Sequence, residues 1–344
     1  MNGSHPDTRH IGAFLRRLEG APPRELQLEV QPLHGGLVAA AVSLVTVHFK
    51  NPYGHSRELT FVVKVLEGPA TREAHVYERL VASHANGLSP RLLGVESLGP
   101  ERHALFLEAV RKAEDWPWRD VEVAQGVLTR LARFHMALPA EEATRVLPPW
   151  DYDAELQHSA LATLEVLEGF RRNPDFAWFT RHVPSVRRMV AALPEVRRQL
   201  LAFSPLGAAP LHGDVHPGNA LVCRRADCHE PVLIDWGRAR VGSPLEDVSS
   251  WLQSLGYWEP EARRRHDTLL AGYLSARGLE RRLDSELRTA YWLAGASNAL
   301  SGALIYHLSV AAAPHVDSHQ RAGAAHSARD WLRVLRRADA SWRG

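Results

Sequence analysis

The chain has 344 residues, of which 45% are hydrophobic and 23% charged, and its formal net charge is +2. This length exceeds what one compact core usually supports, so we expect two lobes with the composition of an ordinary soluble protein. The balanced charge excludes a strong polyanion binder, and two cysteines exclude a disulfide scaffold. The N-terminus has no apolar signal segment, so we expect a cytoplasmic protein. We also expect that it binds neither nucleic acid nor membrane.

The first hundred residues are rich in predicted strands. Residues 38–49 and 58–66 are apolar and β-branched, and the turn-forming residues between them predict a hairpin. Residues 71–83 have the apolar spacing of a helix, and residues 104–110 predict another short strand. We therefore expect a small β-rich lobe over residues 1–108.

Helical patterns dominate after residue 115. We predict helices at residues 120–138, 153–170, 175–202, 245–255, 260–277, 283–310 and 321–338. The exception is residues 220–236, where two short apolar runs flank a polar turn and predict a hairpin. The chain therefore fits the α+β class, with a large, mostly helical lobe over residues 109–344.

One stretch tests the expectation of a soluble protein. Residues 289–314 contain no Asp, Glu, Lys or Arg, and this length could span a bilayer. The stretch also contains Ser297, Asn298, Ser301 and His307, together with several Gly and Ala residues. We predict a buried helix here and keep a membrane span as the alternative.

Oxygen-bearing side chains flank the hairpin predicted over residues 220–236. Asn219 comes just before its first strand and Asp235 just after its second. These two ends meet in an antiparallel pair, and carboxylate and amide oxygens suit Mg²⁺. Asp214 lies five residues before Asn219 and could accept the proton of a substrate hydroxyl. The order Asp214-x-x-x-x-Asn219, then Asp235-Trp-Gly237, matches the spacing of the kinase template.

Three segments of the sequence carry a family resemblance: HGDVHPGN (212–219), IDW (234–236) and VGSPLEDVSSWL (241–252). They resemble the aminoglycoside phosphotransferase and choline kinase family of small-molecule kinases, and the resemblance extends over about residues 33–252. It implies a two-lobed protein-kinase-like fold and an ATP- or GTP-dependent O-phosphotransferase that uses Mg²⁺. The acceptor would be a small molecule, either an aminoglycoside or other antibiotic, or a choline- or sugar-type metabolite.

The resemblance assigns roles in the N-terminal lobe. Gly35 and Gly36 would form a turn whose backbone approaches phosphates, although paired glycines are also common in ordinary turns. Lys64, one of only three lysines, ends a strand and would bind the phosphates. Glu73 would pair with Lys64, or it is simply an acid favoured near a helix N-terminus.

The resemblance also predicts how adenine binds. The carbonyl of Leu107 and the amide of Ala109 would contact its edge, while the alternative for this segment is an ordinary edge strand. The resemblance makes Asp214 the catalytic base and Asn219 and Asp235 the metal ligands.

Three more polar residues near the predicted active site have supporting or undecided roles. We expect His212 to brace the loop by hydrogen bonds, and we leave the role of His216 undecided. Asp247 either caps the following helix or clamps the backbone of the loop.

Three rival functions remain. A metal-dependent hydrolase could use two ligand sets: His212, Asp214 and His216, or Cys223, Cys228 and His229. Pro217 and Gly218 argue against the extended strand that the first set needs. A protein kinase would carry arginine where Gly213 stands, and little chain follows Asp235 to form an activation loop. A non-catalytic nucleotide-binding module need not retain all five kinase positions.

The acceptor is the least constrained feature. Residues 114–122 cluster four acids with Trp116 and Trp118, which suggests either a rim that binds cations or a solvated helix start with buried aromatics.

Overall fold

The computed structural model describes residues 7–33, 39–113, 115–225, 228–280 and 283–343. The chain forms two compact units. The first comprises Met1–Asp115, Arg145–Pro148 and Asn219–Ala239, and the second comprises Trp116–Thr144, Pro149–Gly218 and Arg240–Gly344. The predicted phosphate-binding turn of Gly35 and Gly36 lies outside the described residues.

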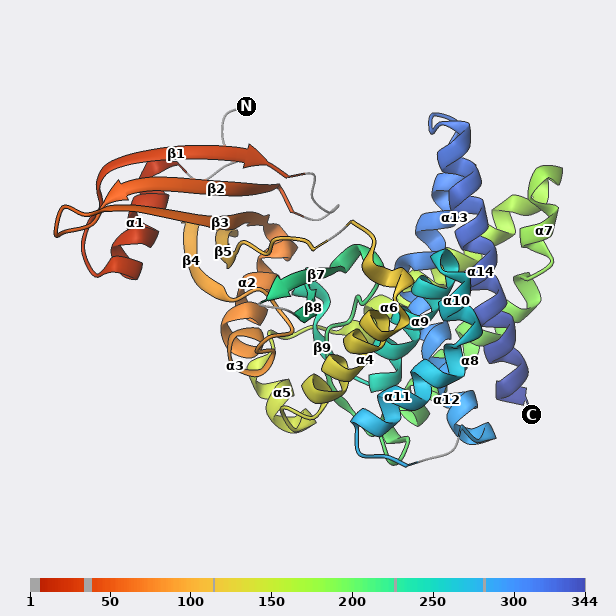
Figure 1. The fold of residues 1–344 in the computed structure, drawn as a ribbon. Helices are drawn as coiled ribbons and strands as arrows, with labels where there is room; N and C mark the ends of the chain where they lie inside the picture. The colour runs from red at the N-terminus through yellow and green to blue at the C-terminus, as the bar shows by residue number, and fades with distance from the viewer. Residues whose placement is uncertain (1–6, 34–38, 114, 226–227, 281–282, 344) are drawn as a thin grey trace. The chain divides into compact units, whose positions relative to one another are not determined.

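A five-stranded antiparallel sheet forms the centre of the first unit (Figure 1), with the strand order β1-β2-β3-β5-β4. The strands are β1 (Arg24–Pro32), β2 (Ala41–Lys50), β3 (Ser56–Glu67), β4 (Leu92–Gly99) and β5 (Arg102–Glu108). The predicted hairpin is confirmed as β2 and β3. β5 lies between β3 and β4, so the alternative of an edge strand was wrong.

An amphipathic helix buries its apolar side against this sheet. Helix α1 (Thr8–Glu19) begins after Asp7, whose side chain accepts a hydrogen bond from the backbone N–H of His10 at 3.0 Å. Phe14 of α1 stacks on Phe106 with a centroid distance of 4.2 Å and meets Phe61 edge-on at 5.2 Å. Aromatic packing of this kind joins the helix to β3 and β5.

The helix predicted at residues 71–83 is present in three segments. These are α2 (Arg72–Val76), a π-helical turn (Tyr77–Val81) and α3 (Ala82–His84). Glu73 is 3% exposed on α2, and a carboxylate buried to this extent would be costly without a partner.

The second predicted hairpin is also present, as β7 (Ala220–Arg225) and β8 (Cys228–Leu233). It packs with the N-terminal unit, because Ala113 N donates to Val222 O at 2.8 Å and Leu233 N donates to Leu88 O at 2.6 Å. A lobe boundary near residue 108 stays our proposal. The compact units differ from that boundary because a late segment, Asn219–Ala239, belongs to the first unit.

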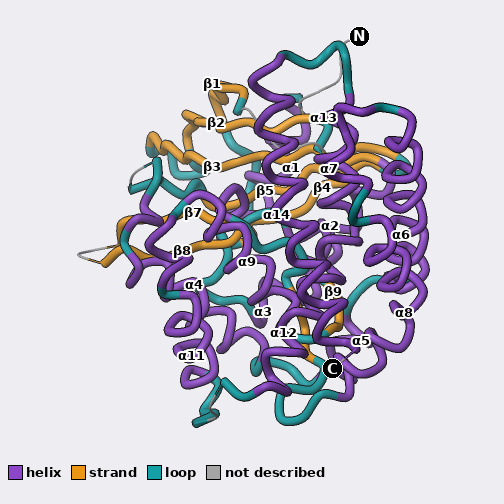
Figure 2. The backbone as a smooth tube through the Cα atoms, turned by 90° about the vertical axis from the view of Figure 1, so that its right-hand side faces the viewer, coloured by secondary structure: helices purple, strands orange, loops and turns teal. Residues whose placement is uncertain are grey.

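Helices make up most of the second unit. The longer ones are α4 (Val121–His135), α6 (Tyr152–Gly169), α8 (Val183–Ala202), α9 (Pro244–Trp258), α11 (His266–Ala276), α12 (Ser285–Asn298), α13 (Leu304–Ala312) and α14 (Ser318–Arg343). Shorter helices are α5 (Ala140–Val146), α7 (Ala177–Thr180) and α10 (Pro260–Arg264). Figure 2 shows α6 and α8 running side by side, and α14 packs against α8, α12 and α13. Two short strands, β6 (Ala209–Leu211) and β9 (Arg240–Gly242), pair within this unit.

The uncharged stretch of residues 289–314 is not one helix. Its backbone breaks at Gly302, which has a φ of 137° that L side chains rarely adopt, inside a π-helical turn between α12 and α13. Much of it is buried, and Asn298 donates from its side chain to the carbonyl of Glu246 at 2.7 Å. Within the described part of the chain, every helix is too short or too polar to cross a membrane.

Candidate active site

A lysine with two carboxylate partners lies in the N-terminal unit. Lys64 is on β3, between Val42 of β2 and Leu105 of β5. Its Nζ lies 2.5 Å from Oε2 of Glu73 and 3.0 Å from Oδ1 of Asp235. The ion pair expected between Lys64 and Glu73 is therefore present, and Asp235 joins it from a segment 171 residues further along the chain.

These two carboxylates set the charge of Lys64. Burial alone would lower the pKa of Lys64, but the charges of Glu73 and Asp235 more than offset it and raise the pKa above its usual value. The amine is therefore cationic at neutral pH, which is the state needed to bind a phosphate.

Asp235 adopts a backbone conformation that costs energy. Its φ of 67° and ψ of 65° are left-handed, a region that non-glycine residues rarely occupy without support from their surroundings. On one side of it, Ile234 N donates to the carbonyl of Asn219 at 2.9 Å. On the other side, Trp236 N donates to Oε1 of Glu73 at 3.3 Å. The two ends of the hairpin thus meet as predicted, which places Asn219 beside the segment that carries Asp235.

The loop after Asp235 has an anchor that sequence reasoning missed. Arg72, at the start of α2, donates from Nη1 to the carbonyl of Gly237 at 2.9 Å and from Nη2 to that of Ala239 at 2.8 Å. Neighbouring residues of α2 therefore hold this loop, with Glu73 accepting and Arg72 donating. The position of Arg72 next to Glu73, the glutamate predicted to pair with Lys64, was the only signal in the sequence.

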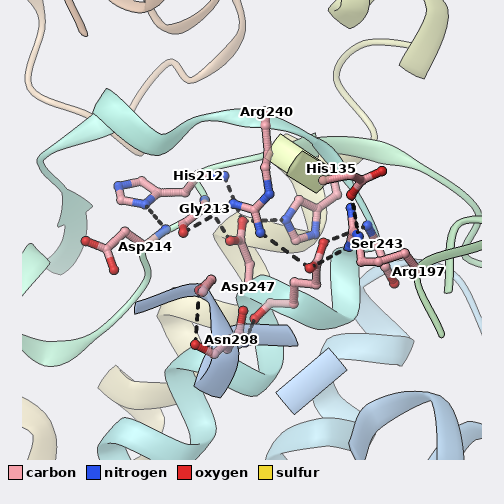
Figure 3. A network of polar contacts seen from close by, with 12 residues as sticks. His135, Arg197, His212, Gly213, Asp214, Arg240, Ser243, Asp247 and Asn298 are labelled. Atoms are coloured by element: carbon pink, nitrogen blue, oxygen red, sulfur yellow. Dashed lines mark hydrogen bonds and ion pairs between the residues drawn. The ribbon is translucent and has the colours of Figure 1, made fainter. Parts of the chain in front are cut away.

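The loop that carries Asp214 belongs to the second unit and is held by side chains (Figure 3). Asp247 of α9 accepts from His212 N at 2.8 Å and from Gly213 N at 2.9 Å. Of the two expected roles of Asp247, the contact with the loop backbone is the one present. Nδ1 of the buried His212 accepts from Asp214 N at 3.2 Å, which is the bracing contact expected of it.

Asp247 is itself fixed from the other side. Nε2 of His135 lies 3.1 Å from Oδ2 of Asp247, and Nδ1 of His135 lies 2.9 Å from the hydroxyl of Tyr273. Burial would raise the pKa of Asp247, but its hydrogen bond to His135 and nearby cationic groups lower it. Burial lowers the pKa of His135. The carboxylate is therefore ionised and orients the loop that precedes Asp214.

A buried arginine pair, also missed from the sequence, lies next to this loop (Figure 3). Arg240 of β9 donates from Nη1 to the carbonyl of Gly213 at 3.3 Å and lies 3.4 Å from Oε1 of Glu246. Arg197 of α8 donates from Nη1 to the same carboxylate oxygen at 2.7 Å. The spacing of Arg197 four residues after Leu193 places it on the apolar side of α8, and that signal could have identified it as buried.

His216 and Asp214 are partly exposed. Nε2 of His216 lies 3.8 Å from Oδ2 of Asp214, and Nδ1 of His216 accepts from Gly218 N at 3.1 Å. The side chains of Asp214 and His216 are 40% and 39% exposed, so a substrate could reach both.

The predicted adenine-binding residues lie at the end of β5. Leu107 has Val62 of β3 and Leu92 of β4 as its neighbours in the sheet, and Ala109 follows the strand. Their contact with adenine stays a prediction.

The alternative metal sites receive no support. Among the residues that the structure describes, no three His, Cys, Asp or Glu side chains gather in a way that could hold a metal ion. The side chains of Cys228 and His229 lie outside the described set.

The described part of the acid-rich segment, residues 115–122, leads into the start of α4. Asp120 accepts from Glu122 N at 2.8 Å and caps α4, while Trp118 is buried against Trp251. Trp116 differs, since its indole N–H donates to Glu259.

Comparison with known proteins places this chain among kinases of small molecules. The profile of the phosphotransferase enzyme family, APH, matches residues 29–284, and the chain belongs to that family. No curated protein sequence matches the chain. The resemblance drawn from the motifs and the α+β, kinase-like fold class are both confirmed.

Solved structures with the same fold include kinases of several acceptors. An amicoumacin kinase in complex with AMP-PNP and Ca²⁺ has a TM-score of 0.58 at 12% identity, covering 95% of this chain and 96% of that one. A choline kinase from Cryptosporidium parvum has a TM-score of 0.57 at 12% identity, covering 90% and 89%. A spectinomycin phosphotransferase in complex with ADP and spectinomycin has a TM-score of 0.53 at 11% identity, covering 98% and 100%. At these identities the likeness shows the fold alone.

Proposed function

We propose that the protein transfers the γ-phosphoryl group of ATP or GTP to a hydroxyl of a small molecule, an aminoglycoside or another antibiotic. The observation that carries this proposal is the buried Lys64 with its two carboxylates, Glu73 and Asp235. A lysine ordered by a helix glutamate beside a metal-binding aspartate is the arrangement that kinases use on nucleotide phosphates. A choline- or sugar-type metabolite is the alternative acceptor.

The donor atoms near the end of the hairpin fit Mg²⁺. Asn219 and Asp235 carry an amide and a carboxylate oxygen, and the hydrogen bond from Ile234 to Asn219 joins the two segments. Hard oxygen ligands of this kind suit Mg²⁺, whose remaining positions are filled by water and phosphate oxygens. We propose that Asn219 and Asp235 hold this ion, which when bound would neutralise charge on the phosphates.

The remaining roles follow the chemistry of each group. Lys64 binds phosphate oxygens as a cation, and Leu107 and Ala109 present backbone groups to the adenine edge. Asp214 accepts the proton of the acceptor hydroxyl as that oxygen attacks phosphorus, and the nucleoside diphosphate leaves. The protein needs no activation-loop phosphate, because side chains within the chain already hold the loop of Asp214.

A nucleotide-consumption screen tests the proposal. ATP and GTP are offered with aminoglycosides, other antibiotics, choline-like amines and sugars. We expect turnover with one of these classes and a loss of about 10²- to 10⁴-fold in kcat in Asp214→Asn, with nucleotide affinity nearly unchanged. Full turnover in Asp214→Asn would remove Asp214 as the base. Absence of nucleotide binding by the wild type would contradict the whole proposal.

A further inference from the structure

The peptide group that joins Gly213 to Asp214 is held at both of its polar atoms. Its N–H, which belongs to Asp214, donates to His212 Nδ1 at 3.2 Å. Its carbonyl, which belongs to Gly213, accepts from Nη1 of Arg240 at 3.3 Å. The direction of this peptide plane sets where the Cα–Cβ bond of Asp214 points. Arg240 therefore touches the backbone that aims the proposed base without touching the reacting atoms.

The fold brings Arg240 to this position through a two-stranded ladder. β9 begins at Arg240, which lies opposite Leu211, the last residue of β6. The chain leaves β6 directly into His212 and Gly213, so a side chain at position 240 lies next to the carbonyl of Gly213. The glycine itself has a φ of 84°, and this conformation turns its carbonyl out of the ladder.

The side chain of Arg240 is also buried and held by neighbouring side chains. Its side chain is 5% exposed, its guanidinium lies 3.9 Å from the ring centre of Tyr152, and Oε1 of Glu246 is 3.4 Å away. Burial opposes its charge, but the phenol of Tyr152 and the carboxylates of Glu246 and Asp247 more than offset this and raise its pKa. Burying a cation is costly, and this buried cation lies beside the carbonyl of Gly213.

We propose that Arg240 is a positioning residue for phosphoryl transfer, which fixes the Gly213–Asp214 peptide and through it the carboxylate of Asp214. This inference rests on the proposed function for its effect on turnover. The contact itself can be tested without any substrate.

The chain offers a matched control. Arg197 binds the same oxygen of Glu246 at 2.7 Å, is buried to the same extent, and lies 5.1 Å from the same Tyr152 ring. Its hydrogen-bond partners are Glu246 and Asp153, which lie outside the loop. Arg197→Met and Arg240→Met thus remove equivalent charges from one carboxylate, and only the second removes a contact with the loop.

The first readout is amide hydrogen exchange of the full chain without ligands, resolved at Asp214 by NMR. We expect the Asp214 amide to exchange at least tenfold faster in Arg240→Met, while in Arg197→Met it stays within about threefold of wild type. Arg240→Lys keeps a cationic donor and should exchange at an intermediate rate. Equal acceleration in both Met variants would show general loosening and overturn the proposal, as would an unchanged rate in Arg240→Met.

The second readout is steady-state turnover with MgATP and the acceptor identified by the screen. We expect kcat to fall about 10- to 100-fold in Arg240→Met with KM for ATP within about twofold, because a small misplacement of a reacting group affects the transition state most. Arg240→Lys should recover part of kcat, and Arg197→Met should stay within about threefold. A rise in KM alone would overturn the positioning role. If the wild type shows no turnover, the proposed function fails, and amide exchange still decides the contact.

Discussion

Both polar backbone atoms of Gly213 form hydrogen bonds with side chains. Its N–H donates to Asp247, its carbonyl accepts from Arg240, and its φ is 84°. The sequence has glycine at this position, where the protein-kinase motif carries arginine. The structure supplies a local reason, since a β-carbon in this left-handed conformation costs about 1–2 kcal/mol.

Replacing this glycine should therefore affect both stability and catalysis. We expect Gly213→Ala to lower the free energy of unfolding by about 1–2 kcal/mol, measured by urea denaturation, and to reduce kcat more than KM for nucleotide. Gly323→Ala is the control, because Gly323 is exposed in α14 and a β-carbon there meets nothing within 4 Å. That change should stabilise the protein by about 0.5–1 kcal/mol. Equal stability in Gly213→Ala and wild type would argue against strain at this position.

The residues of the proposed site could be selected from the sequence, whereas the arginines that contact the same loops could not. Lys64, Glu73, Asp214, Asn219 and Asp235 stand at template spacings, so local order was enough to identify them. Arg72 and Arg240 act on carbonyls far away in sequence, and an arginine in a chain with many arginines has no distinctive pattern.

At the scale of elements, hydrogen bonds join α2 to the loop after Asp235. Glu73 accepts from the N–H of Trp236, and Arg72 donates to the carbonyls of Gly237 and Ala239. Side chains of α2 thus hold the loop through one backbone N–H and two backbone carbonyls of the loop.

Removing Arg72 should release this loop. Arg72→Met leaves the two carbonyls without these bonds, and we expect a loss of about 1–3 kcal/mol in the free energy of unfolding. Isothermal titration with MgATP should also show weaker nucleotide binding, because Asp235 precedes the released segment. Arg79→Met, a change at an exposed position of the following π-helical turn, should alter neither quantity. Unchanged stability in Arg72→Met would mean that water replaces the guanidinium without cost.

Element prediction succeeded for two hairpins, and it missed one helix and the break in another. The hairpins of β2 with β3 and β7 with β8 follow from apolar runs around turn residues. The helix expected at residues 283–310 is interrupted because Gly302 adopts a φ that a continuous helix excludes. Helix α1 was missed although Ile11, Phe14, Leu15 and Leu18 stand at helical spacing after the capping residue Asp7, so the sequence did carry its signal.

At the scale of the whole molecule, buried histidines should make stability depend on pH. Burial lowers the pKa of His135, His266 and His307, and burial with nearby arginines lowers that of His182 to about 4. Below about pH 6.5 these histidines become protonated in the unfolded chain, whereas in the folded chain they stay neutral to lower pH. Stability is therefore greatest above pH 6.5 and is lost as the pH falls toward 4.

Thermal unfolding at pH 7.5 and pH 5.5 measures this effect before most carboxylates titrate. We expect Tm to fall by several degrees at pH 5.5, with each of these histidines contributing up to about 1 kcal/mol. His182→Gln should show a smaller difference in Tm between the two pH values than wild type. His319→Gln, at an exposed position of α14, should keep the wild-type difference. A Tm that is the same at both pH values would show that these histidines titrate alike in both states.

The late hairpin of β7 and β8 has a consequence for any attempt to divide the protein. The backbone passes from one compact unit to the other at residues 115–116, 144–145, 148–149, 218–219 and 239–240. An expressed fragment that stops at residue 115 would contain Lys64 and Glu73 but would lack Asp235 and would leave Arg72 without its carbonyl acceptors. Separate production of the two units therefore requires rejoining the segments in a new order, with residues 219–239 fused to the N-terminal piece.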